Sequence, residues 1–190
     1  MRRVLCTSGK RFSGKDTFAA LLQQAAAARG VTLATYAFAA QCKELFVRSE
    51  RARGVEVDLE RLTRDRAYKE AWRPQLTAFT VASLDADPQI FVRDVARAIE
   101  ADPRPPLITD LRLRLELDFL RPRFALTVLR LQRSDEARAR SGWVFDQDKD
   151  LHHTETELDD PSLWSEVIAN DGTPVELAAA AERVLSAFLS

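Results

Sequence analysis

The chain has 190 residues, of which 46% are hydrophobic and 30% are charged. This length is enough for one well-buried α/β domain and too short for two, so we expect a single domain over residues 1–190. The formal net charge of -1 and the pI near 6.2 argue against partners such as nucleic acid or an anionic membrane, because the field of the whole molecule attracts neither. No leader pattern and no apolar run near the roughly 20 residues of a membrane span is found, so we expect a cytoplasmic protein.

A glycine-rich motif lies near the start of the chain. Residues 9–15 read GKRFSGK and fit the pattern G-x-x-x-x-G-K. The run 3–7 before it is typical of a buried parallel strand, and the helix predicted after it has one apolar face, at Phe18, Leu21, Leu22 and Ala25. At such a strand-to-helix turn, backbone N–H groups and the helix N-terminus bind phosphate oxygens. The motif therefore predicts a nucleotide phosphate site.

The residues that follow the loop indicate a magnesium site. Lys15 is expected to reach the β- and γ-phosphates of ATP. The next position usually holds a Ser or Thr ligand of magnesium, whereas this chain has Asp16 and then Thr17. A carboxylate is a hard oxygen ligand, so we expect Asp16 to hold Mg²⁺ directly or through water. The predicted ATP-binding residues are Gly9, Ser13, Gly14, Lys15, Asp16, Thr17 and, after the last strand, Asn170.

The rest of the chain alternates strand-like and helix-like segments. Strands are predicted at 31–38, 107–110, 124–131 and 167–170. Between the first two of these, residues 40–100 form a helical insertion, with helix starts expected at Pro74 and at Asp87-Pro88. Residues 133–160 are polar and form a candidate lid. A capping box at Thr173 and Glu176 begins the closing helix. This order predicts a doubly wound parallel sheet in a three-layer αβα arrangement, with ligands at the carboxyl ends of the strands.

Arginine carries most of the positive charge outside the loop, and its planar fork suits bidentate phosphate contacts. Arginines recur near predicted strand ends and in the polar segments, which favours a phosphorylated small-molecule substrate. Asp110, at the end of a predicted strand, has two readings that stay open: it could orient an arginine or a magnesium-bound water, or it could cap the next helix.

Several motifs, taken in order, resemble the phosphomevalonate kinases of the animal type. They are the residues at 8–16, 68–73, 87–93, 110–112 and 142–145. The resemblance implies a P-loop kinase of the nucleoside monophosphate kinase-like fold that transfers the γ-phosphoryl group of ATP to mevalonate 5-phosphate. By resemblance, Lys10, Arg11, Lys15 and Asp16 would engage ATP and magnesium, and Arg138 the transferring group. On the acceptor side, the expected residues are Lys69, Arg73, Arg93, Asp110, Arg112 and Arg140.

Alternative functions stay open at this point. The family pattern has basic residues at three positions where this chain has Leu84, Leu113 and Ser141. The lid sequence 152–159, HHTETELD, also resembles deoxynucleoside monophosphate kinases of the phage type. The alternatives are such a nucleotide kinase, a kinase of another small phosphorylated acceptor, or a module that binds nucleotide without phosphoryl transfer. The sequence makes no prediction of oligomeric state.

Overall fold

The computed structural model describes residues 1–190, which divide into two compact units. One unit joins Met1–Thr35 to Asp102–Ser190, and the other is Tyr36–Ala101. The second unit spans nearly the same residues as the helical insertion expected at 40–100. The glycine-rich loop and the candidate lid both belong to the first unit.

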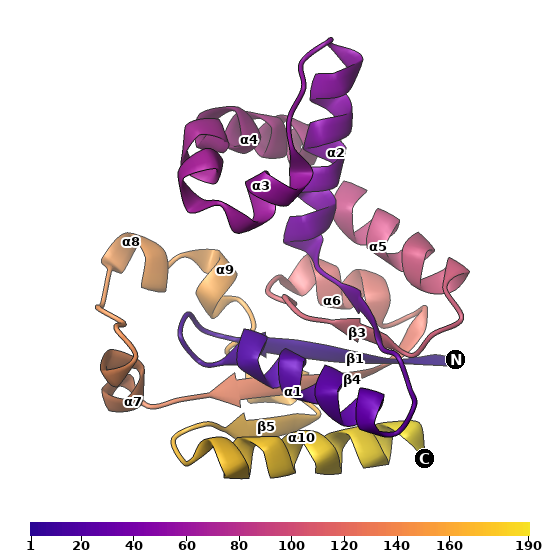
Figure 1. The fold of residues 1–190 in the computed structure, drawn as a ribbon, viewed down its shortest axis with the longest axis vertical. Helices are drawn as coiled ribbons and strands as arrows, with labels where there is room; N and C mark the ends of the chain where they lie inside the picture. The colour runs from indigo at the N-terminus through magenta and orange to yellow at the C-terminus, as the bar shows by residue number, and fades with distance from the viewer. The chain divides into compact units, whose positions relative to one another are not determined.

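A five-stranded sheet with the order β2-β3-β1-β4-β5 forms the centre of the first unit (Figure 1). The strands are β1 (Arg2–Gly9), β2 (Ala34–Tyr36), β3 (Pro106–Ile108), β4 (Phe124–Gln132) and β5 (Glu166–Ala169). β1 pairs in parallel with both β3 and β4, and β4 pairs in parallel with β5. The register places Leu5 opposite Leu107 on one side and Thr127 on the other. The predicted α/β class with a doubly wound sheet is confirmed.

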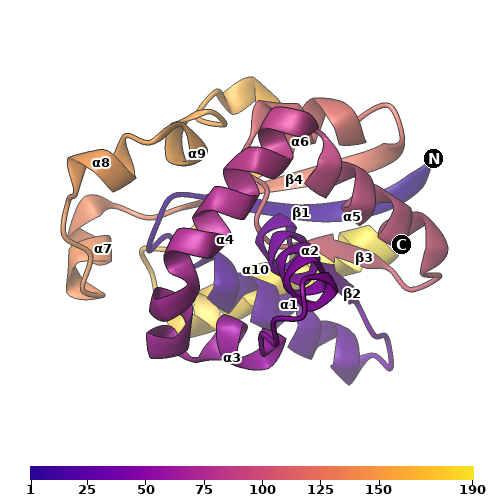
Figure 2. The same cartoon turned by 90° about the horizontal axis from the view of Figure 1, so that it is seen from above.

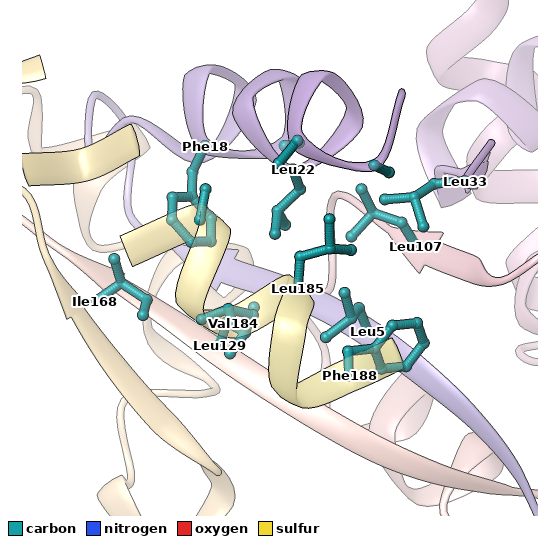
Figure 3. Close-up of a cluster of buried hydrophobic side chains, with 14 of the residues drawn as sticks. Leu5, Phe18, Leu22, Leu33, Leu107, Leu129, Ile168, Val184, Leu185 and Phe188 are labelled. Carbon is teal, nitrogen blue, oxygen red and sulfur yellow. The ribbon is translucent and has the colours of Figure 1, made fainter. Parts of the chain in front are cut away.

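Helices cover the two faces of this sheet. α1 (Lys15–Ala28) and α10 (Pro174–Leu189) pack against one face, and Figure 3 shows their apolar side chains meeting those of the strands. The best-buried members of this core include Leu5, Phe18, Leu22, Leu129 and Leu185. α6 (Arg114–Leu120) lies on the other side of the sheet from α10 (Figures 1 and 2). β1 and β3 lie near the middle of the sheet and are therefore buried between helical layers along most or all of their length.

The candidate lid consists of short elements joined by turns. They are α7 (Asp135–Arg140), α8 (Gln147–Asp150), α9 (His153–Thr156) and a 3-10 turn, η1 (Pro161–Leu163). Each begins with a side-chain cap, from Ser134, Asp146, His152 and Asp160 respectively. The capping box predicted at Thr173 and Glu176 is present at the start of α10.

The second unit is helical and has its own small core. Its helices are α2 (Phe38–Ala52), α3 (Leu59–Arg64), α4 (Arg66–Ala86) and α5 (Ile90–Ala101). Phe46 is fully buried and packs edge-on against Trp72 and Phe79, at ring-centroid distances of 5.9 and 5.6 Å. A cavity of about 710 Å³ opens beside this core between Val47, Val57 and Tyr68.

Two boundary predictions were wrong. The strand expected at 31–38 is confined to Ala34–Tyr36, because α2 already begins at Phe38, whose side chain is buried. Pro74 does not start a helix but lies within α4. The ring of Pro74 is exposed, so water can hydrate the Glu70 carbonyl that loses its helical donor.

None of the helices combines the length and the apolar character that a membrane crossing requires.

Candidate active site

The loop between β1 and α1 requires glycine at two positions. Gly9 has φ +152° and Gly14 has φ +92°, both in the region that side-chain-bearing residues avoid. A Cβ atom at Gly9 would lie 2.7 Å from the Leu131 carbonyl oxygen, and one at Gly14 would lie 2.2 Å from Nδ2 of Asn170. Neighbouring chain segments thus approach the loop so closely that only glycine fits.

Lys15 is the first residue of α1 and is 8% exposed. Its ammonium Nζ donates to the Lys10 carbonyl oxygen at 3.2 Å, across the mouth of the loop. Burial and, to a smaller extent, the charge of Arg112 lower the pKa of this ammonium to about 8, although Glu155 and Asp16 act in the opposite direction. A buried cation at a helix N-terminus is suited to binding a polyanion.

A cavity of about 450 Å³ lies beside the loop, among residues of the loop, of β4 and of the candidate lid. Two buried side-chain atoms without a hydrogen-bond partner belong to its lining, the hydroxyl of Ser13 and Nε of Arg133. Such orphaned polar atoms are costly unless a ligand or water satisfies them. They and the cationic lining residues Lys10, Arg130 and Arg138 fit a phosphorylated ligand.

Asn170, expected to contact ATP, supports the loop. It follows β5, and its side-chain amide donates to the Ser13 carbonyl at 2.9 Å. Its backbone N–H donates to the carbonyl of Gln132 at the end of β4. Asn170 therefore ties the loop to the ends of two strands, and a direct contact with ATP stays a prediction.

Residues 146–159 are here called the acidic segment. Acidic side chains of this segment pair with the cations around the loop. Asp150 accepts from Arg11 at 3.2 Å and from Arg138 at 3.3 Å. Arg138 is buried, its Nε donates to the Arg11 carbonyl at 2.9 Å, and its guanidinium lies 3.9 Å from the centre of the Trp143 ring. Although burial opposes its ionisation, the Asp146 N–H, the Trp143 indole and the two arginines hold the pKa of Asp150 below its usual value. Two predicted catalytic arginines are thus brought together.

Arg112 is held at its backbone and at its guanidinium. Its backbone N–H donates to Glu116 at 2.8 Å, and its guanidinium is ion-paired with Glu155. Burial raises the pKa of Glu116 to about 8, with a contribution from the charge of Asp110, although two backbone N–H groups favour the ionised form. Glu155 is itself buried and also accepts from the Arg11 backbone N–H at 2.6 Å.

Lys10 and Arg130 share a third carboxylate. Asp159 lies 2.8 Å from Nζ of Lys10 and is ion-paired with Arg130. Arg130 is buried at the end of β4, where it also donates to the hydroxyl of Ser8 at 3.0 Å. These contacts connect the loop to the strand beside it.

The remaining predicted site residues are spread over α1, α7, the segment after β3 and the helical unit. Asp16 and Thr17 are exposed on the first turn of α1, and Arg140 is exposed at the end of α7. Asp110 is half-buried two residues after β3, with the charge of Glu116 near it. In the second unit, Arg73 forms a two-pronged pair with Glu70, Arg93 does the same with Asp87, and Lys69 is half-buried on α4. Their contact with a substrate stays a prediction.

From the sequence, no role was assigned to the acids at 150, 155 and 159, whereas Arg130 is one of the arginines near predicted strand ends that were expected to suit phosphate contacts. A sequence indication existed for two of the acids, because Glu155 and Asp159 are part of the lid pattern at 152–159. Nothing in the local sequence indicates which cation each acid pairs with, since Arg11 and Asp150 lie 139 positions apart and Lys10 and Asp159 lie still further apart in the chain.

A sequence model of the phosphomevalonate kinase family matches residues 7–126. A phosphomevalonate kinase of Drosophila melanogaster is 28% identical over 177 residues, which cover 90% of this chain and 89% of the insect protein.

Solved structures with a similar fold include a protein from Thermus thermophilus, with a TM-score of 0.59 and 19% identity over 100% of this chain and 98% of its own. A gluconokinase from Sinorhizobium meliloti has a TM-score of 0.52 and 17% identity, covering 100% and 98% of the two chains. A shikimate kinase from Acinetobacter baumannii also has a TM-score of 0.52, with 12% identity over 100% of this chain and 93% of its own. At these identities the solved structures establish the fold alone.

Proposed function

The chain belongs to the phosphomevalonate kinase family and is an ATP-dependent phosphotransferase, and we propose the following roles for its residues in the transfer. The γ-phosphoryl group of ATP passes to a phosphate oxygen of mevalonate 5-phosphate, giving ADP and mevalonate 5-diphosphate. One P–O bond to the β-phosphate breaks and one P–O bond to the acceptor forms. We also propose that the reaction takes place in the cytosol, as expected from the sequence.

The donor site is the loop between β1 and α1. The observation that carries this assignment is the buried Lys15 ammonium at the start of α1, next to the unsatisfied hydroxyl of Ser13. In this proposal the backbone N–H groups around Gly14 surround the β-phosphate, and Lys15 contacts the β- and γ-phosphates. Gly9 allows the loop to pass close to β4, and Thr17 lies on the same turn as Lys15.

A magnesium ion fits the donor set at this site. Asp16 offers an exposed carboxylate one residue after Lys15, and hard oxygen ligands of this kind suit Mg²⁺, which takes its other ligands from water and phosphate oxygens. When bound with ATP, the ion would neutralise charge on the β- and γ-phosphates. We propose Asp16 as its protein ligand.

Charge neutralisation is the main catalytic task in this proposal. The acceptor phosphate has a second pKa near ~6 and is largely ionised at neutral pH, so no general base is needed. The barrier comes from bringing two anions together, and cations placed around the transferring group lower it. Lys10, Arg11 and Arg138 supply these charges in addition to Lys15. Their pairing with acids fixes their positions before the substrates arrive.

The acceptor side is assigned by family resemblance. Arg112 and Asp110 follow β3, whose carboxyl end lies beside that of β1 in the parallel sheet. Lys69, Arg73 and Arg93 belong to the helical unit and Arg140 to α7, and we propose that they bind the phosphate and carboxylate of mevalonate 5-phosphate. Leu84, Leu113 and Ser141 replace basic residues of the family pattern. In this proposal the arginines that are present, together with Lys69, provide enough positive charge to bind the acceptor.

The aromatic residues that could have stacked on a nucleobase acceptor are used in packing. Trp72 packs against Phe46 in the core of the helical unit, and Phe91 is buried in α5. This observation supports a small non-aromatic acceptor over a nucleoside monophosphate.

The donor-site assignment is tested by Lys15→Met, with Lys149→Met as the matched control. Lys149 is an exposed lysine on α8 whose ammonium pairs with Asp146. We expect Lys15→Met to lower kcat by on the order of 100- to 1,000-fold, because a preorganised cation at the transferring group is lost. Lys149→Met should retain wild-type turnover. ADP release gives kcat, and circular dichroism verifies that both variants are folded. Near-normal turnover of a folded Lys15→Met variant would refute the assignment.

A further inference from the structure

Glu155 is a buried acid without a role in the scheme above. It lies on α9, which Figure 1 shows beside the loop between β1 and α1. The side chain is 4% exposed, and both carboxylate oxygens have partners. One oxygen accepts from the backbone N–H of Arg11 at 2.6 Å, and the other is ion-paired with the guanidinium of Arg112. A single carboxylate thus connects the phosphate loop with the cation that follows β3.

The bond to Arg11 distinguishes Glu155 from its neighbours in the acidic segment. Asp150 and Asp159 reach the loop through the side chains of Arg11 and Lys10, which can move independently of the backbone. Glu155 bonds the loop backbone itself. Arg112 has a second restraint at its backbone N–H, where Glu116 accepts. The backbone and the guanidinium of Arg112 are therefore fixed by two different carboxyl groups.

We propose that Glu155 is a positioning residue for phosphoryl transfer: it holds the Arg112 guanidinium and the Arg11 backbone in the arrangement that the transferring phosphate meets. The inference rests on the proposed function, because it assumes that Arg112 binds the acceptor phosphate, which meets the transferring group. Glu155 acts through these two partners and does not contact the reacting atoms.

Burial argues that Glu155 keeps this place when substrates bind. A carboxylate that merely stood in for phosphate would have to leave its partners, and an unpaired buried charge is costly. Glu155 has almost no exposed surface, in contrast to Asp159, whose side chain is 39% exposed. The two ideas predict opposite results when the charge is removed. If Glu155 only occupied the place of a phosphate group, removing its charge would improve ATP binding without reducing kcat. If Glu155 is a positioning residue, removing its charge reduces kcat.

The test uses Glu155→Gln, Glu155→Ala and the matched control Glu157→Gln. Glu157 lies two residues further along, is exposed, and accepts from the backbone N–H of Arg114 at 2.6 Å. Gln at 155 keeps an acceptor for the Arg11 N–H but loses the charge that holds Arg112. We expect Glu155→Gln to lower kcat by about 100-fold, the size of effect that a small misplacement of a reacting group produces, without raising the KM for ATP. Glu157→Gln should match the wild type.

Two further readouts separate positioning from a structural role. In an Arg112→Gln background, Glu155→Gln should reduce kcat little further, because its effect passes through Arg112. Amide hydrogen exchange at Arg11 should accelerate in Glu155→Ala and stay slow in Glu155→Gln. A kcat for Glu155→Gln within twofold of the wild type would overturn the proposal. A double variant whose loss in kcat equals the product of the losses in the two single variants would also overturn it.

The exchange measurement also keeps this inference separable from the proposed function. If the wild-type protein used another acceptor, the same kinetic comparisons would be made with that acceptor. If it used none, the proposed function would fail, while exchange at Arg11 would still show whether Glu155 holds the loop backbone. Protection of the Arg11 amide in Glu155→Ala equal to that in the wild type would overturn the inference in either case.

Discussion

The charged side chains around the phosphate loop are nearly all paired before any substrate is present. Lys10, Arg11 and Arg138 each contact a carboxylate of the acidic segment. Lys15 instead contacts a backbone carbonyl and has its pKa lowered to about 8 by burial. Paired arginines lose less side-chain freedom when a phosphate arrives, so the network favours catalysis by preorganisation.

The buried carboxyl of Glu116 predicts that the free energy of unfolding depends on pH. Burial raises its pKa in the folded protein to about 8, from about 4.5 in the unfolded chain. A raised pKa means that the stabilising contribution of Glu116 is fully present below pH 4.5 and is lost as the pH rises toward 8. Each unit of pKa shift corresponds to about 1.4 kcal/mol, so the free energy of unfolding should fall by on the order of 3 kcal/mol between pH 5 and 8.

Glu116→Gln should remove this part of the pH dependence, because an amide does not titrate. Asp118→Asn, which changes an exposed acid on the same helix, should leave it in place. Urea unfolding of the three proteins at pH 5, 6, 7 and 8 provides the comparison. Parallel curves for wild type and Glu116→Gln would show that the Glu116 carboxyl does not titrate in this window.

Residue spacing predicted the loop and its cations but not their partners. Gly9, Gly14 and Lys15 stand at fixed offsets in one short motif, and a motif of this kind has one local geometry. The contact between Arg11 and Glu155 joins residues 144 positions apart, and no local pattern encodes it. The two-pronged pairs of Arg73 with Glu70 and of Arg93 with Asp87 are short-range. Composition alone still does not predict which arginines pair with an acid of the chain and which stay available for a phosphate.

At the scale of elements, α1 links the hydrophobic core to the phosphate site. Its N-terminal residue is Lys15, while Phe18 and Leu22 are fully buried against the sheet and α10 (Figure 3). The position of the loop therefore depends on how firmly α1 packs.

Leu22→Ala tests this dependence. We expect the free energy of unfolding to fall by about 2–5 kcal/mol, because the substitution removes buried methyl groups and leaves a cavity. Gln24→Ala, an exposed change on the same helix, should stay within about 0.5 kcal/mol of the wild type. Chemical denaturation measures both. Equal stabilities of the two variants would contradict the assigned packing of α1.

Elements with strong periodicity were predicted well, and those with competing signals were not. The run at 124–131 and the capping box at Thr173 are local patterns that the structure retains. Phe38 has a high strand propensity, yet it begins α2, where its side chain is buried. Pro74 indicates a helix start by local rules, but α4 continues through it while Trp72 and Leu76 pack on the core.

At the scale of the whole molecule, the two units differ in what supports their roles. The unit with the sheet contains the phosphate loop, the acidic segment and the cavity lined by Ser13 and Arg133. The helical unit has its own core and carries three of the arginines and lysines expected at the acceptor. Family membership identifies the acceptor, whereas the geometry of the loop supports the donor. An experiment on acceptor choice therefore tests the donor site and the acceptor assignment together.

The most direct measurement is ADP release from magnesium-ATP with mevalonate 5-phosphate, compared with a panel of ribo- and deoxynucleoside monophosphates. We predict turnover with mevalonate 5-phosphate and none above background with the nucleotides, which would also show that Leu84, Leu113 and Ser141 are compatible with this acceptor. Turnover with a nucleotide and none with mevalonate 5-phosphate would contradict the account.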